Sequence, residues 1–184
     1  QLLAQHLASA GLDLAPVVST GWPADPAQIA AAATLVIYGD GNQAHPAKDH
    51  LDALQHHHAA GKGLAVLHWA LEPSDPKMAA FLTEALGGRF ETDWSVNPIW
   101  KLQDPLLGGH PIARGVQPFA IEDECYFHLR MREGVVPVLR GLPPVGVLGA
   151  DGPYSGNRHV RAALEAKEPQ VLAWAVENGN GSRG

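Results

Sequence analysis

Short apolar runs that alternate with helical segments constrain the fold of this chain more than any other feature. The runs cover residues 14–18, 34–38 and 63–68, and no charge interrupts them. Alternating helices and apolar strands are typical of βαβ units, in which helices cover both faces of a parallel sheet. We therefore predict that the three runs are adjacent parallel strands. The expected helices cover residues 1–10, 26–33, 47–60 and 75–86.

The pattern changes after residue 88, where Pro and Gly recur every few residues. Short apolar runs there predict strands near residues 119–121, 125–130, 135–139 and 171–176, which we interpret as an antiparallel extension of the sheet. The segment Asn178-Gly-Asn-Gly181 is typical of a hairpin turn, and no second strand follows it. Because the chain also opens inside a helix, we predict a single domain that lacks its first strand and its C-terminal strand or helix.

Composition excludes several classes of protein. The 184 residues suffice for one domain, and no apolar stretch reaches the roughly 20 residues that a membrane-spanning helix needs. The net charge of −6 makes nucleic acid an improbable partner. The single cysteine, Cys125, excludes a disulfide framework and any multi-cysteine zinc module. Cytoplasm or periplasm and a homo-oligomeric state are left open.

Polar residues that follow two of the predicted strands are the first candidates for a site. Ligands of open α/β sheets bind beyond the carboxyl ends of the strands. Asp40, Asn42 and His45 follow the run at 34–38, and His68 and Trp69 stand at the end of the run at 63–68. The alternative is structural: Asp40 and Asn42 are common turn residues, and a lone histidine often serves packing.

Two later segments add candidates. Trp94, Asn97 and Trp100 lie close together, and indole faces stack on sugar rings while amides bind hydroxyl groups. The alternative for this segment is a loop whose indoles pin it to the core. Residues 122–124 are three consecutive carboxylates, so strand alternation turns at least one of them inward or leaves it at an edge. An inward carboxylate beside histidines is a candidate metal ligand or acid/base.

Five sequence blocks resemble the ThuA-like (trehalose utilisation) family. The blocks are Gly61-Lys-Gly-Leu-Ala-Val-Leu-His68, Gly87-Gly-Arg-Phe-Glu91 with Trp94-Ser-Val-Asn-Pro98, His110-Pro-Ile-Ala-Arg-Gly115, Asp123-Glu124-Cys-Tyr126-Phe127 and Glu168-Pro-Gln-Val-Leu-Ala-Trp174. The resemblance implies a three-layer, flavodoxin-like parallel sheet of the class I glutamine amidotransferase-like superfamily. It also implies catabolism of trehalose or related 3-keto disaccharides, and a divalent metal such as zinc.

Two function hypotheses follow. In the first, the protein is a sugar-converting enzyme, with His68 and either Glu124 or Asp123 as catalytic groups and with His45 and His68 as candidate metal ligands. In the second, it is a non-catalytic carbohydrate-binding or interaction domain. Convergence of His45, His68 and one acid within about 5 Å favours the enzyme. A glutamine amidotransferase is excluded, since it requires cysteine at position 68. The expected substrate-binding residues are Asp40, Asn42, Trp69, Trp94, Asn97, Trp100 and Tyr126.

Overall fold

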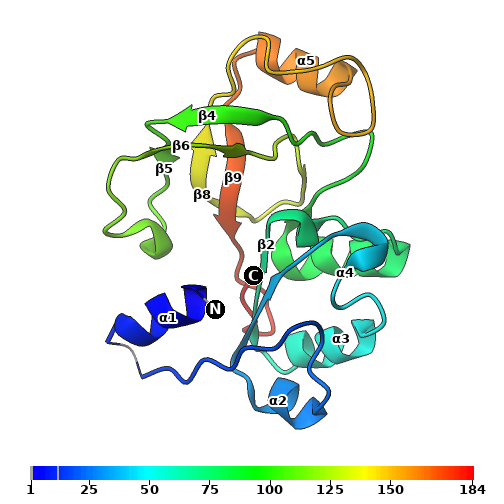
Figure 1. The fold of residues 1–184 in the computed structure, drawn as a ribbon. Coiled ribbons are helices and arrows are strands. Elements are labelled where there is room, and N and C mark those ends of the chain that lie inside the picture. Colours follow the sequence, from blue (N-terminus) through cyan, green and yellow to red (C-terminus); the bar gives the residue numbers. More distant parts are fainter. Residues whose placement is uncertain (1, 12) are drawn as a thin grey trace. The chain divides into compact units, whose positions relative to one another are not determined.

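The computed structural model describes residues 2–11 and 13–184 and divides into two compact units, Gln1–Ala32 and Ala33–Gly184 (Figure 1). The first unit contains helices α1 (Leu2–Ser9) and α2 (Pro26–Ala31). Helix α2 begins with proline in its first turn, and the Asp25 carboxylate accepts a hydrogen bond from the backbone N–H of Ala27 at 2.9 Å. These local signals account for the agreement with the predicted helices.

The predicted strand at residues 14–18 is wrong. The segment forms no strand, and Leu14, Val17 and Val18 are exposed. Pro16 removes a backbone donor from the middle of the run, which disfavours a place inside a sheet. Apolar composition alone does not show whether a neighbouring strand is available for pairing, so it was not enough to predict a strand here.

The second unit opens with a parallel pair of strands. Strand β1 (Thr34–Tyr38) pairs with β2 (Gly63–Leu67) in register from Thr34↔Gly63 to Tyr38↔Leu67. Helices α3 (Leu51–Ala59) and α4 (Pro76–Leu86) both pack against β2. The parallel pairing of the runs at 34–38 and 63–68 is confirmed, and the second strand ends one residue early, at Leu67.

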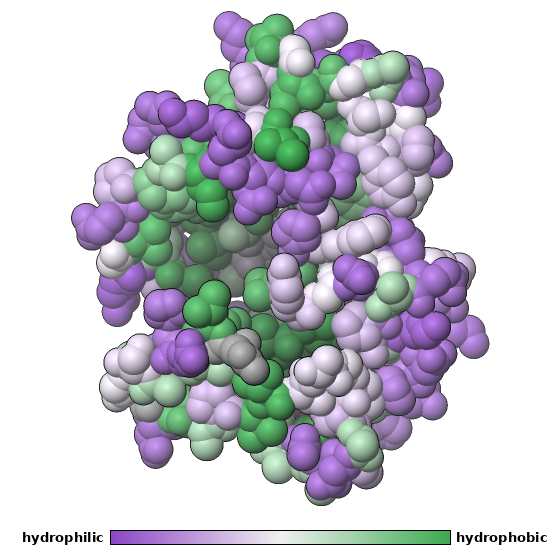
Figure 2. Space-filling view, viewed as in Figure 1, coloured by the Kyte–Doolittle hydropathy of each residue, from purple (hydrophilic) through white to green (hydrophobic). Residues whose placement is uncertain are grey.

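The flavodoxin-like parallel sheet is nevertheless wrong. Within the described residues the only parallel pairing is β1 with β2, and the remaining sheets are short and antiparallel, with two or three strands each. The β1–β2 pair is also not covered on both faces, because Val36, Tyr38 and Leu67 are exposed whereas Ile37 and Leu64 are buried. Figure 2 shows groups of apolar residues at the surface of the face drawn, bordered by polar residues.

The strands predicted near 119–121, 135–139 and 171–176 have counterparts in the structure, whereas the strand predicted at 125–130 is wrong, since only Arg130 of that segment is in a strand. The strands also form separate small sheets instead of one extension. The sheets are β3 (Gly88–Arg89) with β7 (Arg130–Met131), β4 (Ile99–Gln103) with β6 (Ala120–Glu124), and β5 (Leu106–Leu107), β8 (Val136–Gly141) and β9 (Gln170–Ala175) in that order. In Figure 1, β8 and β9 lie side by side, as their antiparallel register requires.

Several small cores stabilise this unit. Val96, Phe127 and Val160 form one cluster, and Ala113, Val138 and Ala175 form another. Val160 comes from helix α5 (Arg158–Glu165), whose Asn157 cap accepts hydrogen bonds from the N–H groups of residues 159 and 160. Short helical turns cover Asn42–Ala44 (η1), His68–Leu71 (η2) and Pro111–Ala113 (η3).

The turn predicted at residues 178–181 is present. The N–H of Gly181 donates to the carbonyl of Asn178, and Val176 and Gly184 exchange backbone hydrogen bonds at 2.8 and 3.0 Å. The residues after the turn therefore pair back onto the chain, which the sequence did not suggest. None of the helices among the described residues has the length and apolar character to cross a bilayer.

Candidate acid/base site

The site is built around a backbone elbow where β2 ends. His68 has φ +58°, in the left-handed region, and starts the turn η2 directly after β2. Asn42, which opens η1 shortly after β1, has φ +52°. Because β1 and β2 are parallel, their carboxyl ends lie at the same edge. Left-handed non-glycine residues cost free energy and cluster at functional sites.

Three polar side chains converge at this elbow. Nε2 of His68 lies 3.6 Å from Oε2 of Glu124, and the Tyr126 hydroxyl lies 3.3 Å from Nδ1 of His68. The same hydroxyl donates to Oε2 of Glu124 at 3.3 Å. Tyr126 is buried, whereas the side chains of His68 and Glu124 keep 38% and 37% of their surface exposed. A solvent molecule or ligand therefore reaches the imidazole and the carboxylate, while the phenol supports both from inside.

Tyr126 stays protonated at neutral pH. Burial raises its pKa most, the charge of Glu124 and the hydrogen bond to it raise the pKa further, and a hydrogen bond with Asn97 opposes the shift. Glu72 also raises this pKa through its charge. The phenol is therefore a hydrogen-bond donor over the whole physiological range.

A buried carboxylate, Glu72, lies behind the elbow. It is 2% exposed, and it accepts hydrogen bonds from the Trp69 indole at 2.7 Å, from the Thr92 hydroxyl at 2.7 Å and from the Tyr154 hydroxyl at 3.0 Å. The amide of Asn42 donates to the same Tyr154 hydroxyl at 3.3 Å. Sequence reasoning missed Glu72 and Tyr154, although Glu72 stands only four residues after His68 in a segment that it had singled out.

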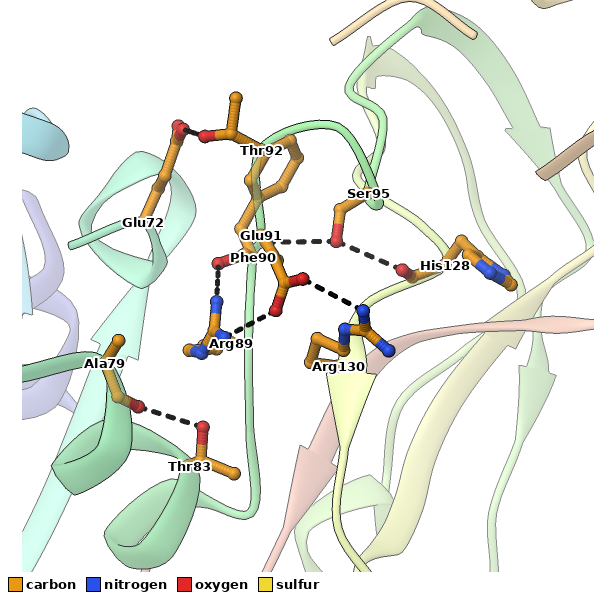
Figure 3. A network of polar contacts seen from close by, with 10 residues as sticks. All are labelled: Glu72, Ala79, Thr83, Arg89, Phe90, Glu91, Thr92, Ser95, His128 and Arg130. Carbon is orange, nitrogen blue, oxygen red and sulfur yellow. Dashed lines mark hydrogen bonds and ion pairs between the residues drawn. The ribbon is translucent and has the colours of Figure 1, made fainter. Parts of the chain in front are cut away.

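An open groove of about 890 Å³ runs beside this network. Its polar lining includes Asn42, Glu72, Ser74 and Thr92, and its apolar wall includes Pro76 and Ala79. Figure 3 shows part of the groove, with Glu72 bonded to Thr92 on one side and Ala79 and Thr83 of α4 on another. A groove of this size holds a ligand of one or two rings.

Glu91 ties together the segments that flank the groove. Its carboxylate pairs with the guanidinium groups of Arg89 and Arg130, and its backbone N–H donates to the Ser95 hydroxyl, which itself donates to the carbonyl of His128 (Figure 3). The hydrogen bond from Arg130 lowers the pKa of Glu91 most; burial opposes the shift, and the charges of both arginines add to it. Both arginines serve this ion pair.

Other predicted site residues lie outside the cluster. His45 is 2% exposed; its Nδ1 accepts from the N–H of Ala47 at 3.1 Å, so Nε2 carries the proton and donates to the carbonyl of Ala70 at 2.9 Å. No ring nitrogen is left to bind a metal or to exchange a proton with a substrate, so the expected convergence of His45, His68 and an acid is reduced to His68 and Glu124. Asp40 and Asp123 are exposed, and the carboxylate of Asp123 caps the N–H of Glu124 instead of joining His68.

The two indoles predicted to stack on a sugar, those of Trp94 and Trp100, already contact other groups of the protein. Trp100 is 4% exposed and donates to the carbonyl of Cys125 at 3.0 Å, so it belongs to the core. The ring of Trp94 packs against the Arg130 guanidinium, 3.4 Å from the ring centroid, and against His159, with centroids 4.1 Å apart. Tyr38 is an exposed aromatic side chain whose ring centroid lies 6.4 Å from that of His68, and Trp69, the next residue after His68 in the chain, is also exposed.

The residues that converge here do not fit a divalent metal. Within residues 2–11 and 13–184 no group of three or more His, Cys, Asp or Glu side chains is placed to hold an ion. One imidazole and one carboxylate meet at the elbow, fewer than the three or four protein ligands that zinc takes.

Comparison of the chain with protein-family models, with curated proteins and with solved structures found no match.

Proposed function

We propose that this protein is a ThuA-like, carbohydrate-active enzyme that moves protons on 3-keto derivatives of trehalose or related disaccharides. The observation that carries the proposal is the contact of His68 with Glu124 and Tyr126 at a left-handed elbow. The sequence blocks that resemble the family contribute all three residues. Their arrangement supports acid/base chemistry, because the Tyr126 hydroxyl contacts both other groups at 3.3 Å and the Glu124 carboxylate lies 3.6 Å from the imidazole.

Proton removal beside a carbonyl is the step that suits this geometry. The unprotonated imidazole of His68 takes the proton from the carbon next to the keto group, and the electron pair of the C–H bond moves to the carbonyl oxygen. Glu124, 3.6 Å from Nε2, stabilises the imidazolium that forms. The protonated phenol of Tyr126, which contacts both His68 and Glu124, turns its O–H from Glu124 to the developing oxyanion.

Substrate binding is assigned to the exposed aromatic rings beside His68 and to Asn42, because the groove itself is not lined by His68, Glu124 or Tyr126. Asn42 offers its amide to sugar hydroxyl groups. Tyr38 is 73% exposed and Trp69 is 40% exposed, so both offer surface to the apolar face of a sugar ring. A metal has no part in this proposal, because its expected ligand His45 has both ring nitrogens bonded to the backbone.

Turnover of trehalose and of 3-keto disaccharides tests the proposal. We expect wild-type activity on the keto sugars, and a fall of roughly 10²-fold or more in His68→Ala, the usual scale for losing one acid/base group. His56→Ala is the matched control, since His56 is exposed on α3 and its imidazole contacts the Asp52 carbonyl of its own helix. Sugar binding without turnover by the wild type would favour the non-catalytic binding domain. Wild-type turnover in His68→Ala would remove His68 from the mechanism.

A further inference from the structure

We propose that Glu72 is a positioning residue that holds His68 in its strained elbow through contacts at both ends of the turn η2. His68 begins this turn, and Glu72 follows its last residue. A turn of four residues has little stability of its own, and the left-handed backbone of His68 adds strain. Something outside the turn must therefore fix it. The catalytic consequence rests on the function proposed above.

The side chain of Glu72 collects donors from three separate segments. Trp69 lies within the turn, Thr92 lies in the segment beside the groove, and Tyr154 comes from a loop 82 residues further along the chain. Every donor is neutral, and none of the ion pairs of the described residues includes Glu72. A carboxylate offers about four acceptor sites and no donor, so it can serve all three groups at once. A glutamine offers one acceptor oxygen and two donors that would face these groups.

The backbone of Glu72 ties the elbow to the neighbouring strand end. The N–H of Asn42 donates to the carbonyl of Glu72 at 2.6 Å, and the N–H of Glu72 donates to the carbonyl of Trp69 at 2.9 Å. Gly41 permits this approach, since a Cβ there would lie 2.6 Å from the Trp69 carbonyl oxygen and 2.8 Å from that of Glu72. The backbone of Glu72 thus links Asn42 to the turn that His68 begins, and these are the two left-handed residues of the site.

The charge of Glu72 also acts on the site directly. It raises the pKa of Tyr126, the phenol beside His68. The ring centroids of His68 and Tyr126 lie 4.9 Å apart. A shift of the His68 backbone would change this distance, so contacts between the two rings measure the position of His68. This gives a readout that does not depend on turnover.

The test compares Glu72→Gln with Glu165→Gln, a control at an exposed position on α5. We expect Glu72→Gln to lower kcat on 3-keto disaccharides by roughly 10²-fold with little change in KM, the scale of a 1 Å misplacement. Nuclear Overhauser contacts between the rings of His68 and Tyr126 should weaken in the folded variant, and the control should match wild type in both. Thr92→Val removes one of the three hydrogen bonds to Glu72 and should lower kcat and weaken the ring contacts to a smaller extent. This variant replaces Glu72→Gln in the test if Glu72→Gln does not fold.

Two results would overturn the positioning role. One is wild-type kcat with intact ring contacts in the folded variants. The other is a lower kcat with unchanged ring contacts, because Glu72 would then act by another route. If the wild type has no turnover, the proposed function fails, and the ring contacts alone decide whether Glu72 positions His68.

Discussion

Replacing His68 by glycine and by alanine tests whether its backbone is strained. The left-handed conformation costs an L-residue roughly 1–2 kcal/mol, whereas glycine adopts it freely. Glycine loses about 0.5–1 kcal/mol more than alanine through backbone entropy. Both variants lack the imidazole, so its lost contacts cancel. His68→Gly should therefore be more stable than His68→Ala by about 0.5–1 kcal/mol, which corresponds to about 1–4 °C in Tm for a chain of this size.

Urea unfolding followed by circular dichroism measures this difference. The same pair of substitutions at Leu67 is the control, because Leu67 has φ −120° in the extended region. There alanine should be the more stable residue. A His68→Ala variant as stable as His68→Gly, or more stable, would refute the reasoning that the elbow stores strain.

Three further predictions each concern a single residue. Burial, with the charge of Asp123, raises the pKa of Cys125 to about 11. The rate of alkylation by iodoacetamide should therefore be low at pH 8 and rise about tenfold per pH unit towards pH 11. A rate that levels off near pH 9 would contradict this. Because the pKa of Glu91 is lowered on folding, its stabilisation exists above its ordinary pKa of about 4.3 and is lost as pH falls through the lowered value. Glu91→Gln should therefore destabilise at pH 7, and its difference from wild type in urea unfolding should shrink below about pH 4; a constant difference would disprove the linkage. Gly41→Ala should cost about 1–3 kcal/mol of unfolding free energy through its clash with the elbow, whereas Gly109→Ala, with open space around its Cβ position, should cost far less in the same assay.

The sequence predicted those elements whose signals are local. Asp75 and Pro76 mark the start of α4, and the apolar runs before residues 39 and 68 form the paired strands β1 and β2. Sheet continuity is a long-range property, and no local pattern shows which strands stay unpaired. The run at 14–18 has strand-like composition without a partner, and the later strands pair in separate small sheets. The flavodoxin-like prediction failed for that reason.

The candidate site was predictable to the same extent. The position of His68 at the end of an apolar run singled it out, and the acidic run supplied Glu124, but nothing in the sequence separates Glu124 from Asp123. Tertiary packing decides whether the ring nitrogens of a histidine are free to bind a ligand or are hydrogen-bonded to the backbone. The sequence does not show this, which is why His45 was predicted to be a metal ligand. Glu72 was missed because two of its three donors, Thr92 and Tyr154, come from other segments that only the fold brings together.

Hydrogen–deuterium exchange on a 3-keto disaccharide tests the central claim most directly. If His68 removes the proton next to the keto group, incubation in D2O with wild-type protein should place deuterium at that carbon, and proton NMR should show the loss of its signal. His68→Ala should slow the exchange by roughly 10²-fold or more, and His56→Ala should not. Exchange at the uncatalysed rate with the wild type, or at the wild-type rate with His68→Ala, would contradict the account.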